Sequence, residues 1–458
     1  MPCAARKGHV ERKAVNVERY WSDVPQRESR SKVALPRDPP HFTPSDYAGT
    51  IPPGLVRFWL ERFKEFLFPP IPRPDDCALV LSGGGARAAY QAGVLRYIAE
   101  TFPDKGFHII AGVSAGAINA AQLANHTGTF EQAANHLVHS WTKIRTEKVF
   151  EAESGLSMLW GLLRRGNGAG ASGEEVTTLD VRGTHGLVDT TPLWSFLEQE
   201  FQAPDGVLSG IEVNLKRNRL KAAAVVTTNY ATGQTVTWVQ GKDFDLWERP
   251  DRISVNTTLS VDHVMASTSI PLIFPAVRIG DMWYGDGGVR LAAPLAPAVH
   301  LGADRIMAIS TRYKQSRAEA DEPTVQGYPP AAQIMGMLMN AIFMDALDQD
   351  AFTLQRINKL VEDMPQRLRH DMRPIQLLQI RPSVDLGRLA STREPSLPGG
   401  LRFLTSGLGT EETLSPDWLS VLLFEEDYVA RLLEIGYEDA HHQHDEIVKF
   451  FDGVAPFR

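Results

Sequence analysis

The chain has 458 residues, of which 43% are hydrophobic, and a formal net charge of −8 at pH 7. This length allows one large core and a smaller module, and the acidic balance argues against a nucleic-acid partner, which would need a basic patch. No run of about 18 apolar residues predicts a transmembrane helix, and the charged start lacks the apolar core of a secretory signal. We therefore expect a cytoplasmic protein, with peripheral membrane contact as an alternative. The two cysteines, Cys3 and Cys77, are expected to be free thiols.

Residues 1–75 are predicted to form an N-terminal arm with one amphipathic helix. The first 50 or so residues are polar and proline-rich, which is typical of an extended or poorly ordered segment. Over 55–68 the apolar side chains share one helical face and the charged ones lie largely opposite. This helix either packs on the following domain or docks on a bilayer, because Trp59 and Phe63 beside basic residues suit a membrane interface.

Two runs about thirty residues apart share one pattern, namely an apolar stretch, a glycine-rich break and an alanine-rich stretch. The first begins at Cys77 and the second at His108. The pattern predicts strand, tight turn and helix twice in succession. Two such units build a parallel sheet through a right-handed crossover.

The second turn reads Gly112-Val113-Ser114-Ala115-Gly116, a Gly-x-Ser-x-Gly nucleophile elbow. Such a serine sits on a sharp, strained turn, so glycine is needed on both sides where a Cβ would collide with the strand and helix. The N-terminus of the following helix points at the serine and stabilises negative charge there. The pattern predicts a catalytic serine at residue 114.

The first turn, Gly83-Gly84-Gly85-Ala86-Arg87, admits three interpretations. A dinucleotide fingerprint would require an acidic residue after the second strand, where the serine elbow stands instead. A phosphate-binding P-loop would require a Gly-Lys-Ser/Thr ending, which is absent from the sequence. We favour an oxyanion hole, made by the N–H groups of the three glycines together with that of Ala115.

Asp286 follows a short strand pair predicted over 278–284 and precedes Gly287 and Gly288. An aspartate before two glycines is, by itself, a turn residue. With the elbow and the glycine loop before it in the chain, we expect its carboxylate to take the proton of Ser114 as a general base. Near neutral pH this requires burial to raise its pKa.

A histidine-based triad is the rival mechanism, because α/β-hydrolases place serine, acid and histidine in that chain order. His300 is expected at the end of a helix, and His441, His442 and His444 on a solvated, charged helix. The spacing of the last three could suit a metal, but no carboxylate pattern accompanies it. We therefore favour the dyad and expect no metal.

Together, the motifs at 83–87, 112–116 and 284–288 resemble those of the patatin-like phospholipases. The resemblance extends over about 76–312, and segments at 189–193, 228–233 and 266–275 are similar too. It implies a Ser114/Asp286 dyad without histidine, a calcium-independent lipid acyl hydrolase and no cofactor.

The resemblance also bears on the residues around the dyad. Gly112, Gly116 and Gly287 would support its turns, and Arg87 would orient the glycine loop or meet a lipid phosphate. The chain departs from the family pattern in having Ala88 where a glycine is usual. It also has 292–294 as Ala-Ala-Pro where the family carries asparagine before proline.

The remaining elements complete the predicted architecture. The glycine-rich run at 151–186 is either a lid over the acyl pocket or an idle surface loop. The methionine-rich run at 332–347 is either core or a wall of the acyl site. We expect helices over 130–145, 191–201, 262–270 and 425–451, strands over 220–228, 234–240, 308–312 and 375–382, and loop over 385–415.

These elements predict an α/β fold with a central, mostly parallel sheet flanked by helices. We divide the chain into the arm at 1–75, a catalytic domain at 76–312 and a mainly helical C-terminal extension at 313–458. The expected function is hydrolysis of carboxylic esters in phospholipids or related lipids. The alternatives are a non-phospholipid esterase or thioesterase, and a catalytically silent lipid-binding protein. The sequence does not specify an oligomeric state.

Overall fold

The computed structural model describes residues 76–151, 188–271, 273–321, 337, 346–369, 372–391 and 416–453. The chain divides into two units, Met1–Pro72 and Arg73–Arg458, and every described residue belongs to the second. The expected amphipathic helix at 55–68 lies outside the described residues. So do the glycine-rich insertion after its first residue and nearly all of the methionine-rich run.

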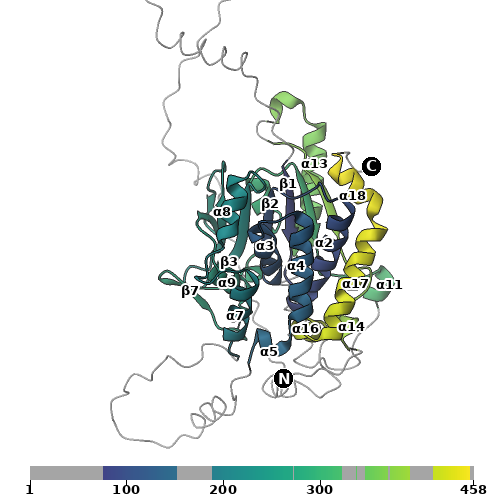
Figure 1. Ribbon diagram of the computed structural model, residues 1–458. Coiled ribbons are helices and arrows are strands. Elements are labelled where there is room, and N and C mark those ends of the chain that lie inside the picture. Colours follow the sequence, from purple (N-terminus) through teal and green to yellow (C-terminus); the bar gives the residue numbers. More distant parts are fainter. Residues whose placement is uncertain are drawn as a thin grey trace, which may run out of the picture. The chain divides into compact units, whose positions relative to one another are not determined.

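In the described part of the chain, ten strands form one mixed sheet in the order β10-β9-β1-β2-β3-β4-β6-β5, with β8 paired to β3 and β7 to β8 (Figure 1). The five strands from β10 to β3 run parallel, whereas β4 and β8 run antiparallel to β3. This confirms the mostly parallel sheet. The strands are β1 Cys77–Leu81, β2 Ile109–Val113, β3 Ala222–Asn229, β4 Thr235–Gly241, β5 Glu248–Arg249, β6 Arg252–Asn256, β7 Val277–Ile279, β8 Met282–Asp286, β9 Arg305–Ile309 and β10 Gln376–Ile380.

Helices cover both faces of this sheet. Along β1, Leu79 and Leu81 belong to one hydrophobic core, and Ala78 and Val80 belong to the other. A strand buried on both faces is a continuous apolar run, as the sequence of β1 shows. The helices are α2 Ala89–Thr101, α3 Ala115–Asn125, α4 Phe130–Lys143, α5 Thr146–Val149, α7 Thr191–Glu200, α8 Ser209–Lys216, α9 Val261–Thr268, α10 Ala296–His300, α11 Arg317–Ala320, α13 Ala346–Asp363, α14 Leu386–Ser391, α16 Pro416–Leu422, α17 Glu426–His442 and α18 His444–Phe451.

On one face, α2, α3, α4 and α17 lie side by side (Figure 1). The contact between α2 and α17 depends on two glycines. A Cβ at Gly93 would overlap with the carbonyl oxygen of Leu433, and one at Gly436 would overlap with that of Tyr90. The two backbones therefore touch, which requires a residue without a side chain at each crossing point. On the other face, α10 and α13 supply the apolar side chains that cover the strands.

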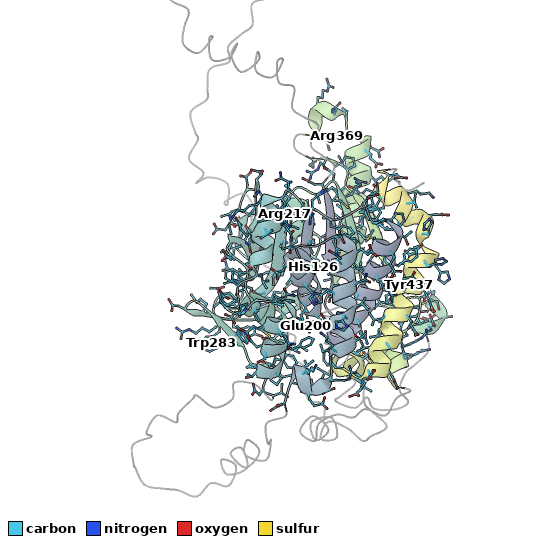
Figure 2. All side chains as sticks on the ribbon, viewed as in Figure 1. His126, Glu200, Arg217, Trp283, Arg369 and Tyr437 are labelled. Carbon is cyan, nitrogen blue, oxygen red and sulfur yellow. The ribbon has the colours of Figure 1, made fainter. Side chains whose placement is uncertain are left out.

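The part after residue 312 contributes both a strand and helices. The strand predicted over 375–382 is β10, and it pairs in parallel with β9. The helix predicted over 425–451 is two helices, α17 and α18, separated at Gln443. The hairpin β7–β8 extends from the sheet with Trp283 close to its turn (Figure 2).

The prediction of a loop over 385–415 is wrong at its start, where the structure has helix α14. The Asp385 carboxylate accepts hydrogen bonds from the N–H groups of Gly387 and Arg388, at 2.8 and 3.2 Å, and so caps the helix. The Tyr428 hydroxyl donates to the Leu386 carbonyl at 3.0 Å. This cap and this tertiary contact stabilise a helix too short to be recognised from periodicity. The sequence analysis also missed α8 and the strand pair β5–β6.

Candidate active site

Ser114 lies between the end of β2 and the start of α3, with φ 54° and ψ −135°. A positive φ is uncommon for a residue with a side chain, so this turn is held in a strained conformation. A Cβ at Gly112 would overlap with the Gly116 carbonyl, and one at Gly116 would overlap with the carbonyl oxygens of Leu81 and Ser82. The two flanking glycines are therefore needed for the close approach predicted for a nucleophile elbow.

Ser267, at the end of α9, lies outside the 112–116 motif and forms a hydrogen bond with the backbone of its turn. Its hydroxyl accepts a hydrogen bond from the Ser114 N–H at 3.0 Å and donates one to the Val226 carbonyl at 2.6 Å. Ser267 is fully buried, and Val226 belongs to β3, which neighbours β2 in the sheet. One side chain thus satisfies two buried backbone groups and ties the elbow to the next strand. Spacing along the sequence carried no signal of this contact.

Asp286 ends β8 and is completely buried. Its Oδ1 accepts a hydrogen bond from the Gly288 N–H at 2.8 Å, and its Oδ2 is buried without a hydrogen-bond partner. Its backbone is fixed on both sides, because its N–H donates to the Ser269 carbonyl at 3.0 Å and its carbonyl accepts from the Thr228 hydroxyl at 2.9 Å. A Cβ at Gly287 would overlap with the Val226 carbonyl, so this glycine is needed for the turn.

Burial raises the pKa of Asp286 to about 7, from an ordinary value of 3.8. The Ser114 hydroxyl and the Gly288 N–H act in the opposite direction and limit the rise in pKa. Ser114 is thus close enough to influence the carboxyl, although the pair does not meet the geometry of a hydrogen bond in this structure. Such contacts often tighten only when substrate is bound. A carboxyl with a pKa near 7 can both accept and return a proton at neutral pH.

The glycine loop passes directly over the elbow. A Cβ at Gly83 would stand 2.8 Å from the Cβ of Ser114. Gly84 and Gly85 have φ values of 145° and 56°, which favour glycine. None of the three N–H groups donates a hydrogen bond to another residue that the structure describes, and the same is true of Ala115. These four groups are therefore free to bind an oxyanion next to Ser114.

Buried polar side chains hold this loop in place. The Thr311 hydroxyl donates to the Gly83 carbonyl at 2.5 Å, and the Gln91 amide donates to the Ser82 carbonyl at 2.8 Å. Behind them, the Asn119 amide donates to the Gln91 side chain at 2.9 Å and accepts from the Trp141 indole at 2.8 Å. The network connects the loop to α3 and α4, and no local sequence pattern identifies it.

The Arg87 side chain lies inside the protein, where it contacts α16. It is buried, and its Nε donates to the Ser420 hydroxyl at 2.7 Å. Val421, which follows Ser420 in α16, packs closely against the glycine loop. A Cβ at Gly85 would overlap with the Val421 carbonyl oxygen. Of the two roles considered for Arg87, orientation of the loop fits this position. The other role, contact with a lipid phosphate, does not fit a guanidinium enclosed in this way.

An apolar cavity opens beside Ser114. It holds about 20 Å³, enough for about one water molecule. It is lined by Gly85, Ser114, Ile118, Ile144, Val149, Leu193, Thr268, Ile270, Phe274, Val421, Leu422 and Phe424. The apolar lining suits a hydrocarbon chain, but the cavity in this structure is too small to admit one unless the surrounding side chains move.

The histidines considered for a triad contact residues other than Ser114 and Asp286. The ring of His300, at the end of α10, stacks on Trp247 with centroids 4.7 Å apart. His441 and His442 are exposed on α17, as predicted. His444 differs from the prediction, because it is half-buried and shares a hydrogen bond of 2.9 Å with the Tyr97 hydroxyl. In the described part of the chain, no group of three or more potential ligands could hold a metal ion.

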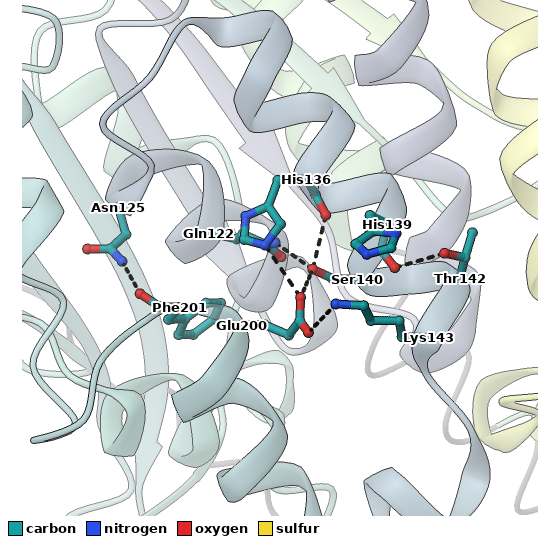
Figure 3. Close-up of polar contacts among 9 residues, drawn as sticks. All are labelled: Gln122, Asn125, His136, His139, Ser140, Thr142, Lys143, Glu200 and Phe201. Atoms are coloured by element: carbon teal, nitrogen blue, oxygen red, sulfur yellow. Dashed lines mark hydrogen bonds and ion pairs between the residues drawn. The ribbon is translucent and has the colours of Figure 1, made fainter.

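A cluster of charged and polar side chains connects α3, the helix that follows Ser114, to α4 and α7 (Figure 3). Glu200, at the end of α7, is buried and binds the Ser140 hydroxyl at 2.6 Å and the Lys143 ammonium at 3.0 Å. Ser140 also accepts from the Gln122 amide of α3 at 2.7 Å. Burial alone would raise the pKa of Glu200, but these donors and His136 outweigh it and hold the pKa below its usual range.

A family model described as patatin-like phospholipase matches residues 79–299. No curated protein matches the chain. Among the described residues, no helix is both long and apolar enough to cross a membrane.

Three solved structures are similar at low identity. Human GIVD cytosolic phospholipase A2 is 13% identical, with 82% of this chain and 60% of that chain covered and a TM-score of 0.42. VipD from Legionella pneumophila is 15% identical, with 79% and 67% covered and a TM-score of 0.30. The ExoU–SpcU complex of Pseudomonas aeruginosa is 17% identical, with 82% and 77% covered and a TM-score of 0.23. The match thus spans less than two thirds of the human protein's length.

The segment matched by the family model contains the glycine loop, the elbow at Ser114 and the turn at Asp286. The structure brings these three features together at one edge of a parallel sheet. The chain thus contains a segment, residues 79–299, that matches the patatin-like phospholipase family.

Proposed function

We propose that the protein is a lipid acyl hydrolase that cleaves carboxylic esters of phospholipids or related lipids through Ser114 and Asp286. The observation that carries the proposal is the state of the Asp286 carboxyl. One of its oxygens is held by the Gly288 N–H, and the other is buried without a partner beside the serine elbow. A proton acceptor that is fixed, buried and free on one side is what a dyad without histidine requires.

The reaction begins when the Ser114 hydroxyl oxygen attacks the acyl carbonyl carbon and its proton moves to Asp286. The carbonyl oxygen becomes an oxyanion, which accepts hydrogen bonds from the glycine loop and the Ala115 N–H. The bond to the alcohol then breaks, and the alcohol oxygen takes the proton from Asp286. Water gives a proton to the same carboxylate and attacks the acyl-serine; the bond to the Ser114 oxygen then breaks, this oxygen takes the proton back from Asp286, and the fatty acid is released.

The apolar lining of the small cavity beside Ser114 favours a substrate with a hydrocarbon acyl chain, which could enter only after the surrounding side chains move. The absence of a histidine from the contacts of Ser114 among the described residues favours the dyad over the triad. The pKa of Asp286, about 7, is suited to general base catalysis near neutral pH.

The test is hydrolysis of p-nitrophenyl esters of increasing acyl length, followed by phospholipids in mixed micelles. The wild type is compared with Ser114→Ala, Asp286→Ala and Asp286→Asn, each checked for its fold by circular dichroism. We expect each substitution to lower kcat by at least about 1,000-fold, because removing a member of a nucleophile–base pair abolishes most of the catalytic effect.

Two outcomes would contradict the proposal. Activity of Asp286→Asn near that of the wild type would require another base. A wild type that binds micelles without hydrolysing any ester would favour a lipid-binding protein. Hydrolysis of the p-nitrophenyl esters without hydrolysis of phospholipids would support the dyad and replace the substrate class by other esters.

A further inference from the structure

The hairpin β7–β8 projects past the edge of the sheet that carries the proposed dyad. Along β8, Tyr284 lies opposite Asn229, the last residue of β3, so the residues before Tyr284 continue past the carboxyl end of β3. Ser114 follows the carboxyl end of β2, the parallel neighbour of β3, and therefore lies at the same edge. Four residues of β8 separate Met282, next to the hairpin turn, from Asp286, which corresponds to about 14 Å of strand.

Both faces of this hairpin expose apolar side chains near its turn. Successive side chains of a strand point to opposite faces, so Met282 and Trp283 lie on different faces of β8. Met282 is 42% exposed and Trp283 is 44% exposed. Across the two strands, Met282 is paired with Ile279 and Trp283 with Arg278. The turn thus presents apolar surface in two directions (Figure 2).

Tyr230 enlarges the face that carries Trp283. Its N–H donates to the Trp283 carbonyl at 2.9 Å, which continues the pairing of β3 with β8 by one residue. A Cβ at Gly285 would overlap with the Tyr230 hydroxyl, so the tyrosine ring lies over the same face of β8 as Trp283. The tyrosine is 44% exposed. Tryptophan and tyrosine combine an apolar ring with a polar group, and both favour the boundary between lipid and water.

The charges at the turn compensate each other. Nη2 of Arg278 lies 3.3 Å from Oδ1 of Asp281, and its Nε donates to the Gly280 carbonyl at 3.1 Å. These two are the only charged residues in 277–284, so the hairpin carries no net charge. Apolar surface, and not charge, therefore determines what the turn can bind. A flat protein surface would cover one face and leave the other in water, whereas a lipid interface surrounds the turn and covers both.

We propose that the turn of the hairpin β7–β8 docks the protein on a zwitterionic phospholipid surface, with Met282, Trp283 and Tyr230 at the boundary between head groups and acyl chains. The choice of lipid as the partner rests on the proposed function, because docking at the turn directs the edge with Ser114 and Asp286 toward the surface that contains the substrate. The dyad is then held within about 14 Å of the lipid.

Binding is measured by flotation of the full-length protein with vesicles of phosphatidylcholine. Ser114→Ala is the background for every variant, so that the vesicles stay intact. We expect this protein to bind saturably. Adding Met282→Ser and Trp283→Ser together should weaken binding at least about tenfold, because two partly exposed side chains lose their transfer into an apolar phase. Adding Trp283→Phe instead, which keeps an aromatic ring, should preserve most of the binding.

The matched control replaces one aromatic and one aliphatic side chain on α13. Phe352 is 56% exposed and Leu360 is 67% exposed, more than either hairpin residue. Asn358, which lies between them, bonds to both backbone groups of Ile375, just before the start of β10. This part of α13 is therefore near the opposite edge of the parallel sheet. Phe352→Ser with Leu360→Ser should leave vesicle binding unchanged.

Salt provides a second control. Because the hairpin carries no net charge, binding to phosphatidylcholine should change little between about 0.1 and about 1 M NaCl, over which the Debye length falls from about 10 to about 3 Å.

Hydrolysis separates docking from catalysis. With Ser114 intact, Met282→Ser/Trp283→Ser should keep the wild-type kcat on soluble p-nitrophenyl butyrate. Its release of fatty acid from phosphatidylcholine vesicles should fall about tenfold, in proportion to the lost binding. A wild type that is inactive on every ester would contradict the proposed function and not the docking, which the flotation experiment measures without turnover.

Three results would overturn the inference. The first is no binding to phosphatidylcholine vesicles, or binding that requires anionic lipid and disappears at high salt. The second is an equal affinity with and without the two hairpin substitutions, or an equal loss in the α13 control. The third is self-association in sedimentation experiments that the hairpin substitutions abolish, in the absence of vesicle binding, which would make the partner a second copy of this chain.

Discussion

In the proposed dyad, Ser114 gives its proton to Asp286, so the pKa of Asp286 should decide at which pH the protein is active. Burial raises this pKa to about 7, so the carboxylate is protonated at acidic pH and cannot accept the serine proton. We expect kcat/KM for a phospholipid or p-nitrophenyl ester to be constant above about pH 8 and to fall about tenfold per unit below about pH 6. Released fatty acid is measured by chromatography from pH 4.5 to 9.

The control for this profile is Asp286→Asn, whose residual rate should show no rise through pH 7. A wild-type profile that stays flat down to pH 5 would mean that the base has an ordinary carboxyl pKa, and the assignment to a buried Asp286 would then be wrong.

Ser267 is a positioning residue, because it touches the backbone of the elbow and not the reacting atoms. Ser267→Ala leaves the Ser114 N–H and the Val226 carbonyl without their partner. We expect a loss of about 1–3 kcal/mol in unfolding free energy, measured by urea titration. The kcat should fall while KM changes little, because the strained φ of Ser114 is no longer fixed.

The matched control is Ser269→Ala, which removes a buried hydroxyl that, among the described residues, donates to the Met265 carbonyl of the adjoining helix α9. It should cost stability without a comparable fall in kcat. Restoration of kcat by Ser267→Cys, but not by Ser267→Val, would distinguish hydrogen bonding from packing. An unchanged kcat in Ser267→Ala would show that the elbow holds its geometry without this contact.

Substitutions at the crossing of α2 and α17 can show how tightly the C-terminal helices pack against the core. Gly93→Ala places a Cβ on the Leu433 carbonyl, a backbone atom that can move only if α17 moves. We expect a loss of about 1–3 kcal/mol, as for other overpacked cores. Gly106→Ala is the control, because a Cβ there meets nothing within 4 Å and should be neutral or slightly stabilising.

Thermal midpoints by differential scanning calorimetry compare the two variants. Equal midpoints would mean that α17 shifts without loss of packing, and that the contact between the two helices is less specific than the glycines indicate.

The strands and turns that carry the motifs could be predicted because their signals are local. Apolar runs ending in glycine gave β1 and β2, and the pattern before Asp286 gave β7 and β8. The residues that support the turns could not be found in this way. Ser267, Thr311 and Ser420 lie far along the chain from the groups they bind, and a serine or threonine by itself predicts no partner.

For the whole molecule, the raised pKa of Asp286 makes stability depend on pH. The folded-state pKa, about 7, exceeds the ordinary value of 3.8, so its contribution is fully present below about pH 4 and is lost as pH rises through 7. Asp286→Asn avoids the buried charge. We expect it to be more stable than the wild type by up to about 4 kcal/mol above pH 7, with the gain disappearing toward pH 4.

Urea titrations of both proteins at pH 4.5, 6 and 8 measure this difference. A gain that is the same at every pH would come from packing or hydrogen bonding and not from the carboxyl charge. A gain that grows with pH would show that the buried carboxylate is held at the expense of global stability.

The contact of α16 with the glycine loop has a consequence for the order in which the protein becomes active. Ser114 and Asp286 both leave the ribosome well before Ser420 and Val421. Ser420 accepts a hydrogen bond from Arg87, and Val421 packs against Gly85. During synthesis the proposed nucleophile and base are therefore present while the wall that shapes the loop is still missing. A nascent chain stalled before residue 416 should carry the proposed catalytic serine and yet hydrolyse no lipid, so we expect activity only after α16 has been synthesised.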